Sequence, residues 1–334
     1  MNKSLLLRLG AVFLLVVVIS AAAIYFTFDI KALSYIHMFR VDCLFLAFGS
    51  LFIGLLFDGI RLKTLTSITG EILPLRQVAN VVLSNYFLAL VTPGASGGAI
   101  AQIMFMKKAG IPVAKASVVV LVRTIFSIIF LMLLVPFVLH LDPDIANWMS
   151  PTLITLVSML FTALPIMAII LMHTVYPEKW IIACTKRFSQ NVQFKSLLWY
   201  HEFKKACFVI AKSPWKVLRA FVESGLSLLF IYGCVPAYFS GIDFEFNFVQ
   251  VMGRMVLLNL VLYFSPTPGG SGIAEAGFVV LFSKILPDGL AGIMAVMWRF
   301  TAEYVPFLIG GAFCIKAFGT DVLNLLSKKE EPQQ

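Results

Sequence analysis

Two short motifs of nearly identical sequence lie in corresponding parts of the chain, and each is followed by an arginine inside an apolar stretch. The first reads TPGASGGA from Thr92 and the second reads TPGGSGIA from Thr267, so six of eight positions match. Arg123 follows the first motif and Arg299 follows the second at nearly the same distance. A guanidinium group binds phosphate through a planar pair of donors. Arginines in apolar surroundings therefore indicate a site for an anionic group such as a phosphate.

The residues of both motifs predict a break in a helix. Proline has no backbone N–H, and the residue before it leaves helical space, whereas glycine tolerates positive φ and allows a tight reversal. A half-helix that starts after such a turn directs its free N–H groups at the turn, and these groups favour anions. The alternative is a Gly/Pro kink that only allows close packing. The predicted turn residues are Pro93, Gly94, Gly97, Pro268, Gly269 and Gly272.

Other polar residues accompany the two arginines. Glu303 lies four residues after Arg299, a spacing that places both on one helix face, and Glu275 directly follows the second turn. Charged groups inside a membrane usually face a cavity or a partner. The predicted substrate-binding residues are Arg123, Arg299, Glu303, Glu275, Ser96, Ser271, Asn85 and Asn259. In the alternative interpretation the charges form ion pairs that hold the bundle together. Glu223 and Arg254 are interpreted as interfacial residues that reach the polar surface by snorkelling.

The composition places these residues in a membrane protein. Of 334 residues 60% are hydrophobic and 13% are charged, and the mean hydropathy is +0.94. Soluble domains average about 45–50% apolar and about 25% charged residues. The net charge of +9 comes from basic residues between apolar segments, so we expect no nucleic-acid partner. The five cysteines are scattered, and the sequence predicts no metal site, no cofactor and no catalytic residue.

The apolar stretches predict an all-α integral membrane protein. A span needs about 20 apolar residues. We predict six full spans and two apolar stretches interrupted by Pro and Gly, 78–106 and 251–286. The predicted spans are 9–28, 41–57, 113–139, 150–172, 217–240 and 289–318.

Lys and Arg residues set the expected orientation. Most of the 26 lie in the N-terminus, 58–77, 107–115, 173–219 and the C-terminal end. Cytoplasmic loops hold the excess of such residues. We therefore expect a multi-pass protein of the inner (cytoplasmic) membrane with both termini in the cytoplasm. Each interrupted stretch then enters the membrane and returns to the same side, and the two stretches enter from opposite faces.

This arrangement is an inverted repeat, which in transporters places the substrate site at the repeat interface. The predicted domain is 1–320, with repeat halves at about 41–139 and 217–318. Segment 173–216 mixes aromatic and basic residues and is interpreted as a cytoplasmic amphipathic segment. Residues 321–334 are interpreted as a disordered tail.

The motif SPTPGGSGIAEAGFVVLF, with VTPGASGGAIAQIMFMKKAGIPVAKASVVVLVRTI before it, resembles the lysylphosphatidylglycerol synthase transmembrane family. This flippase-like group, also called UPF0104, is similar to the N-terminal flippase domain of MprF-type proteins. The resemblance covers about residues 8–320 and implies a role for the turn residues, both arginines, Glu275 and Glu303. One departure is that the first motif often continues with a glutamate in the family, where this chain has Ile100 and Gln102.

Three functions remain open at this stage. The first is a flippase or transporter that moves an anionic or aminoacylated phospholipid, or a polyprenyl- or hopanoid-linked lipid, by alternating access. The second is a non-catalytic accessory subunit of a lipid-modifying synthase. The third is a membrane-embedded lipid-phosphate enzyme, which would require clustered acid and base groups. Because the chain stops soon after 320, we expect no soluble lysyltransferase domain. A separate synthase or glycosyltransferase and a homodimer remain open as partners.

Overall fold

The computed structural model describes residues 40–327 except 91, 93–94, 147–149, most of 151–175, 187–189, 243 and 288. The regular structure in these ranges is helical. It comprises α2 (Val41–Ile68), α3 (Leu75–Leu90), α4 (Ser96–Lys108), α5 (Val113–Leu141), α6 (Pro143–Ala146), α8 (Tyr176–Thr185), α9 (Gln190–Ala211), α10 (Pro214–Tyr232), α11 (Cys234–Phe239), α12 (Phe248–Leu262), α13 (Ile273–Phe282), α14 (Leu290–Arg299), the π-helical turn η2 (Phe300–Tyr304) and α15 (Val305–Ser327).

Three of these segments are long and apolar enough to cross a membrane. They are α2, α5 and the continuous α10–α11 segment Pro214–Phe239. At 1.5 Å per residue, a helix of 28 residues reaches about 42 Å, which exceeds the hydrocarbon thickness of a bilayer. They correspond to the predicted spans 41–57, 113–139 and 217–240. The all-α membrane class is thereby confirmed.

The remaining predicted spans have different outcomes. The span 9–28 lies outside the described residues, as does nearly all of 150–172. The span 289–318 consists of α14, η2 and α15. Helix α15 continues to Ser327, which is inside the segment that we assigned to a tail, and residues 328–334 are outside the described part.

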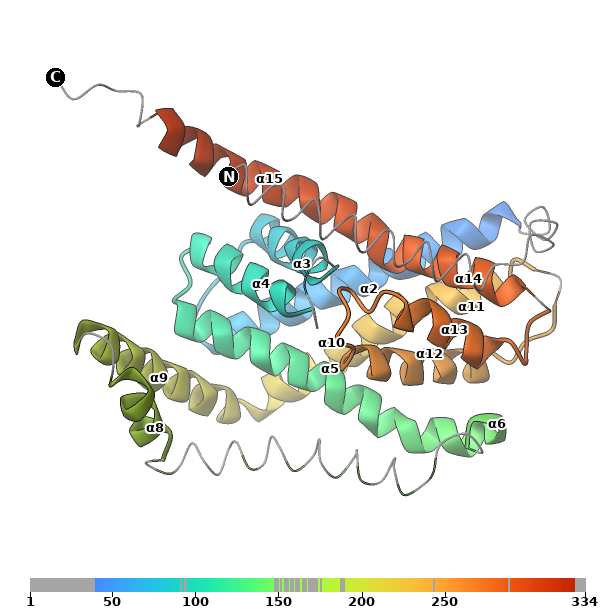
Figure 1. The fold of residues 1–334 in the computed structure, drawn as a ribbon, viewed down its shortest axis with the longest axis horizontal. Coiled ribbons are helices and arrows are strands. Elements are labelled where there is room, and N and C mark those ends of the chain that lie inside the picture. Colours follow the sequence, from blue (N-terminus) through green and yellow to red (C-terminus); the bar gives the residue numbers. More distant parts are fainter. Residues whose placement is uncertain are drawn as a thin grey trace.

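Both interrupted stretches fold as helical hairpins. α3 and α4 pack so closely that a Cβ at Gly98 would collide with the Asn85 side chain. α12 packs against α13, where a Cβ at Gly277 would lie 2.7 Å from Leu258 Cδ1. Figure 1 shows the two hairpins approaching each other from opposite ends of the long helices.

The tips of the hairpins meet in the interior. Gly269, in the second turn, has a φ of +57°, and an added Cβ would collide with Leu90 at the end of α3. Glycine therefore serves two purposes here, since it adopts a left-handed conformation and permits close approach. The contact places both broken segments at the middle of the molecule, where their freed backbone groups need partners other than lipid.

The apolar core forms two clusters, one on either side of this contact. One cluster includes Leu62, Leu65, Val81 and Phe105 around α3 and α4. The other includes Tyr238, Phe278 and Trp298 around α11, α13 and α14. Helices α2 and α5 contribute side chains to both clusters, so they connect the two ends of the bundle.

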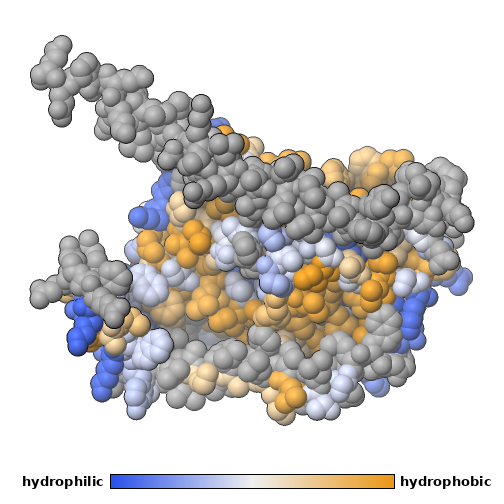
Figure 2. Space-filling view, in the orientation of Figure 1, coloured by the Kyte–Doolittle hydropathy of each residue, from blue (hydrophilic) through white to orange (hydrophobic). Residues whose placement is uncertain are grey.

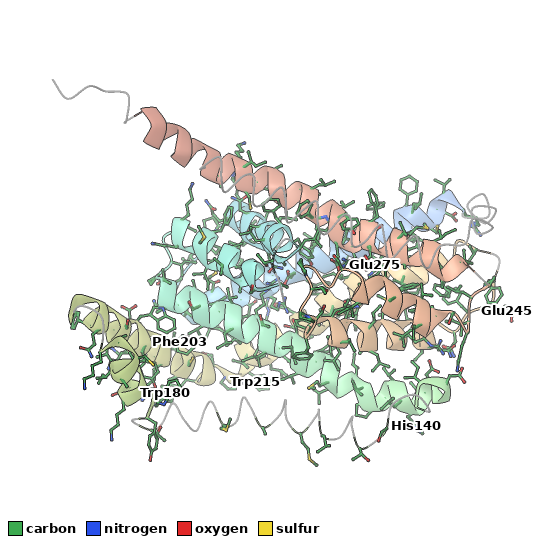
Figure 3. All side chains as sticks on the ribbon, in the orientation of Figure 1. His140, Trp180, Phe203, Trp215, Glu245 and Glu275 are labelled. Carbon is green, nitrogen blue, oxygen red and sulfur yellow. The ribbon has the colours of Figure 1, made fainter. Side chains whose placement is uncertain are left out.

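The surface fits a bilayer environment. Figure 2 shows hydrophobic residues over the middle of the visible face and hydrophilic residues toward the ends of the long helices. The exposed aromatic residues Trp180 and Trp215 belong to α8 and α10. In Figure 3, Trp180 and Phe203 lie at one end of the molecule and Glu245 lies at the other. The segment 173–216, which we predicted to be amphipathic, contains α8 and α9.

Three charged residues are more deeply buried than the sequence analysis predicts. The predicted span 41–57 ends too early, because α2 continues to Ile68, and Arg61, which we counted with the basic residues of 58–77, is only 4% exposed. Arg254 does not reach the surface as the snorkelling interpretation expects, because it is 1% exposed and its guanidinium pairs with Asp142 at 2.7 Å. Glu223 is also buried and accepts a hydrogen bond from Arg219 at 2.7 Å. Each has a carboxylate or guanidinium partner that the hydropathy pattern did not reveal.

Candidate functional site

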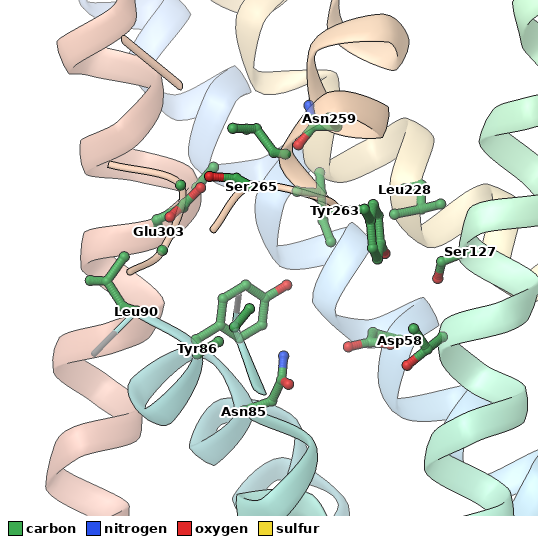
Figure 4. Close-up of a pocket in the computed structure, with 18 of the residues that line it drawn as sticks. Asp58, Asn85, Tyr86, Leu90, Ser127, Leu228, Asn259, Tyr263, Ser265 and Glu303 are labelled. Atoms are coloured by element: carbon green, nitrogen blue, oxygen red, sulfur yellow. The ribbon is translucent and has the colours of Figure 1, made fainter. Parts of the chain in front are cut away.

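A cavity of about 430 Å³, lined by both polar and apolar side chains, lies between the two hairpins. Its walls come from α2, α3, α4, α5, α10, α12, the second turn, α14 and η2. Small-molecule sites typically occupy about 300–1,000 Å³, so this cavity is large enough for a polar lipid headgroup. Figure 4 labels ten of the lining residues. Asn85 and Tyr86 of the first hairpin lie on one side of the cavity, and Asn259 and Tyr263 lie on the other.

One wall of the cavity carries a cluster of two arginines and one aspartate, which we call the first cluster. Asp58 on α2 accepts a hydrogen bond from Arg123 Nε at 3.0 Å, and its carboxylate forms ion pairs with both Arg123 and Arg61. All three side chains are buried. Two guanidinium groups against one carboxylate leave a formal excess of one positive charge, which favours an anion in the adjacent cavity.

Arg61 is held by hydroxyl groups as well as by Asp58. Its Nη1 donates to Ser127 Oγ at 2.8 Å and to Ser224 Oγ at 2.9 Å. Its buried Nε has no hydrogen-bond partner within the described part of the chain. Buried donors are nearly always hydrogen-bonded. The unpaired Nε of Arg61 is therefore a further buried donor on the positively charged wall of the cavity.

An amide relay connects Arg123 to the first hairpin. Arg123 Nη1 donates to Gln102 Oε1 at 2.7 Å, and Gln102 Nε2 donates to Asn85 Oδ1 at 2.6 Å. Ile100, where the family pattern often has glutamate, is 56% exposed. The acid that neutralises Arg123 is thus Asp58 on α2, and α4, the helix that begins in the first motif, does not supply it.

A second charged group lies against the second hairpin. It consists of Glu275 on α13, Arg299 on α14 and Glu303 in η2, and we call it the second cluster. Arg299 Nε donates to Glu275 Oε1 at 3.1 Å, Nη1 donates to the Gly269 carbonyl at 3.0 Å, and the guanidinium pairs with Glu303. Glu275 also accepts from the Gly272 N–H at 2.7 Å. Arg299 and Glu275 are each 1% exposed. They replace the backbone partners that the broken helix has lost.

The two helix starts after the turns already have acceptors. Thr92 Oγ1 accepts from the Gly97 N–H at 2.8 Å at the start of α4. Glu275 places a carboxylate at the start of α13. An incoming anion would therefore compete with Glu275 at the second turn, whereas the first cluster offers it an excess of positive charge.

The structure separates the predicted substrate-binding residues into two groups. Arg123, Glu303, Ser96, Asn85 and Asn259 line the cavity. Arg299, Glu275 and Ser271 are not among its lining residues and surround the second turn instead, where Arg299 Nη2 lies 3.4 Å from Ser271 Oγ.

The turn residues are placed in part. Pro93 and Gly94 lie outside the described residues. Gly97 is enclosed by Thr92 and the Leu88 carbonyl, so any side chain there would collide. Gly272 has a φ of +83° and follows Pro268 and Gly269 in the second turn. The glycines therefore occupy positions where larger residues would be strained or would clash.

Sequence reasoning missed several cavity residues. Asp58 and Arg61 stand at i, i+3 directly after an apolar run, which would have indicated an ion pair if α2 had been extended past 57. Gln102 follows the first motif and was noted only as a departure from the family. Three tyrosines from separate segments contribute rings to the cavity, and their sequence positions gave no signal. They are Tyr86, Tyr232 and Tyr263.

The side chains of the described residues were compared with the ligand sets that metal ions need. No group of three or more His, Cys, Asp or Glu side chains among the described residues could hold a metal ion. Of the two cavity carboxylates, Asp58 is engaged by two arginines and Glu303 by one. The arrangement presents guanidinium groups to an anion, and its carboxylates serve as ion-pair partners.

Comparison with known proteins agrees with this architecture. The model of the family described as "Lysylphosphatidylglycerol synthase TM region" matches residues 13–310. A UPF0104 membrane protein from Archaeoglobus fulgidus is 21% identical over 270 residues, which cover 75% of this chain and 79% of the relative. The family model describes the transmembrane region of a synthase-like family and is not by itself a catalytic domain. This chain is a multi-pass membrane protein that belongs to the lysylphosphatidylglycerol synthase transmembrane-region family.

Proposed function

We propose that this protein is a lipid transporter that moves a phospholipid or another phosphate-bearing lipid between the leaflets of the inner membrane, with both termini in the cytoplasm. The observation that carries the proposal is the cavity between two opposed helical hairpins, with buried side chains that carry an excess of positive charge on one wall. A headgroup phosphate would bind at Arg61 and Arg123 through paired donors. The acyl chains would stay in the lipid.

The mechanism that fits this geometry is alternating access. In inverted-repeat transporters, the repeats rock around a site near the midplane. Here the contact of Leu90 with Gly269 joins the two hairpin tips beside the cavity. Separation of these tips toward one face would expose the cavity to that leaflet. The relay from Arg123 through Gln102 to Asn85 would couple the bound headgroup to movement of the first hairpin.

The same geometry makes an enzymatic role less suitable. General acid–base catalysis needs a group that can give or accept a proton near the reacting bond. Asp58 and Glu303 are each held in ion pairs with arginine. We therefore propose a transporter that has no catalytic function of its own.

Leaflet exchange in liposomes tests the proposal. The purified protein is reconstituted with acyl-labelled phosphatidylglycerol, lysyl-phosphatidylglycerol or a polyprenyl phosphate, and the accessible fraction of label is followed with a membrane-impermeant quencher. We expect exchange of at least one lipid class, at least about tenfold slower in Arg123→Ala, because a charged hydrogen bond contributes about 1.5–3 kcal/mol. Leu121→Ala is the matched control, since Leu121 is an exposed apolar residue on the same helix.

The controls separate transport from leakage and misfolding. Each variant must elute as a single species in detergent, and liposomes without protein set the background. Exchange by wild type that Arg123→Ala leaves unchanged would contradict the role of the first cluster. Absence of exchange for every lipid would reject the transporter and favour an accessory subunit of a separate synthase.

A further inference from the structure

Helix α8 carries an exposed row of apolar and aromatic side chains outside the cavity between the hairpins. Tyr176, Trp180 and Cys184 stand four residues apart, so they lie on one face of the helix. Tyr176 is 65% exposed and Trp180 is 75% exposed, and Cys184 is exposed as well. Pro177 and Ile181 lie beside the row, and the five residues contribute to a surface groove. Exposed apolar surface of this kind marks an interaction site.

This row faces away from the helix against which α8 packs. That helix is α9, whose Gln193 Nε2 donates a hydrogen bond to the Ile182 carbonyl at 3.4 Å. An α-helix turns about 100° per residue, so Ile182 stands about 200° around the helix axis from Trp180. The contact with α9 therefore directs the face with Trp180 to the other side of α8.

The charge around α8 is strongly basic. Residues 173–219 contain nine Lys or Arg and two Glu. Lys179 and Lys186 are exposed and stand seven residues apart, which is nearly two helical turns, so they share a second face of the helix. A helix with aromatic residues on one face and lysines on another lies in the membrane interface, where anionic lipids attract it. The composition of α8 thus fits an anionic lipid surface.

A bilayer surface lies at the end of the molecule where α8 is found. Figure 3 places Trp180 and Trp215 toward the end opposite Glu245. Trp215 is 82% exposed and lies in the first turn of α10, which begins a segment long and apolar enough to cross a membrane. Tryptophan at the end of a span sits at the level of the lipid headgroups. The headgroups of one leaflet therefore lie at the same end as the apolar face of α8.

We infer that α8 docks on this leaflet, with Tyr176 and Trp180 inserted among the headgroups and Lys179 and Lys186 bound to anionic phospholipids. The occupant of the surface is thus the lipid of the surrounding membrane and not a protein. These four residues are not among those that line the cavity between the hairpins. The inference therefore goes beyond the proposed transport function and does not depend on it.

Cys184 supplies a reporter on the docking face, because it is the exposed member of the five cysteines. The full-length protein is labelled there with an uncharged environment-sensitive fluorophore and reconstituted into nanodiscs of phosphatidylcholine alone or mixed with phosphatidylglycerol. Nitroxide-labelled lipids in the same nanodiscs quench a fluorophore that enters the headgroup region. We expect stronger quenching with phosphatidylglycerol, and a return to the phosphatidylcholine level at high salt, which screens the attraction. Labelling of Cys184→Ser gives the background from the other cysteines.

Matched variants assign the attraction to the two lysines. Combining Lys179→Gln with Lys186→Gln should lower the ratio of docked to undocked label in the mixed nanodiscs about fivefold for each lysine, as expected for one basic residue at an anionic surface. Lys63→Gln is the control, since Lys63 is an exposed lysine on α2, and it should leave the quenching unchanged. A single elution peak establishes that each variant is folded. Unchanged quenching in the folded double variant would overturn the role of the two lysines.

Two other results would overturn the inference. Equal quenching in both lipid compositions would mean that α8 inserts without any selectivity for anionic lipids. Absence of quenching in both would mean that α8 stays off the bilayer. If acrylamide in the aqueous phase then also fails to quench the label, a protein surface, such as a second copy of the chain, covers α8 instead.

Discussion

The two arginines that follow the repeated motifs are neutralised in different ways. Arg123 pairs with Asp58 on the long helix α2, and Asp58 also pairs with Arg61. Arg123 is linked to the first hairpin by its hydrogen bond to Gln102. Arg299 is enclosed by two glutamates and bonds directly to the turn carbonyl of Gly269. Similar sequences thus produce one arginine that lines the cavity and one that stabilises a turn. The two halves of a repeat can thus share a broken helix while their arginines have different roles.

The largest expected effect comes from removing Arg299. Arg299→Ala leaves Glu275 and Glu303 without their cation in a buried setting, and breaking a buried ion pair costs about 3–5 kcal/mol. We expect loss of the folded protein or a large fall in its unfolding free energy, measured by denaturant titration in detergent micelles. A variant as stable as wild type would mean that the second cluster does not support the turn.

Arg123→Ala should destabilise the fold less and impair transport more. Asp58 keeps Arg61 as its partner, so the loss is mainly that of hydrogen bonds to Asp58 and Gln102, about 1–3 kcal/mol. The same titration gives the stability, and the leaflet-exchange assay gives the transport rate. If Arg123→Ala proved less stable than Arg299→Ala, the assignment of binding and structural roles would have to be exchanged.

Gly98→Ala tests how tightly the first hairpin must pack. The added methyl would collide with the Asn85 side chain and disturb the relay to Arg123, and overpacking costs about 1–3 kcal/mol. Gly49→Ala is the control, because nothing lies within 4 Å of a Cβ at that helical position. There we expect no loss, and a gain of up to about 1 kcal/mol from helix propensity. Equal effects at both glycines would rule out the steric explanation.

The two asparagines that precede the motifs should give the smallest difference. Asn85 accepts a hydrogen bond from Gln102, whereas Asn259 Nδ2 donates to the Met255 carbonyl of its own helix at 2.9 Å. Asn85→Ala leaves the buried Gln102 amide without its acceptor, which costs about 1–3 kcal/mol, and Asn259→Ala should cost about 0.5–1.5 kcal/mol. Unfolding of both variants side by side checks the order. The reverse order would show that the relay is not maintained in solution.

Much of the architecture was predictable because it follows from local rules. Apolar length identified α2, α5 and α10–α11, and Pro and Gly located both hairpin turns. The i, i+4 spacing anticipated the pair of Arg299 and Glu303. The end of α2 was misplaced, since its charged residues look like loop residues unless their partners are known.

The sequence by itself determined that this is an all-α membrane protein with two matching broken segments, because hydropathy and turn chemistry act over a few residues at a time. Only the tertiary structure decided that Asp58 joins Arg123, that Gln102 links Arg123 to Asn85, and that Glu303 faces the cavity while Arg299 does not. Those outcomes depend on which helices pack together, and the need to neutralise buried charges selects partners that are far apart in the chain.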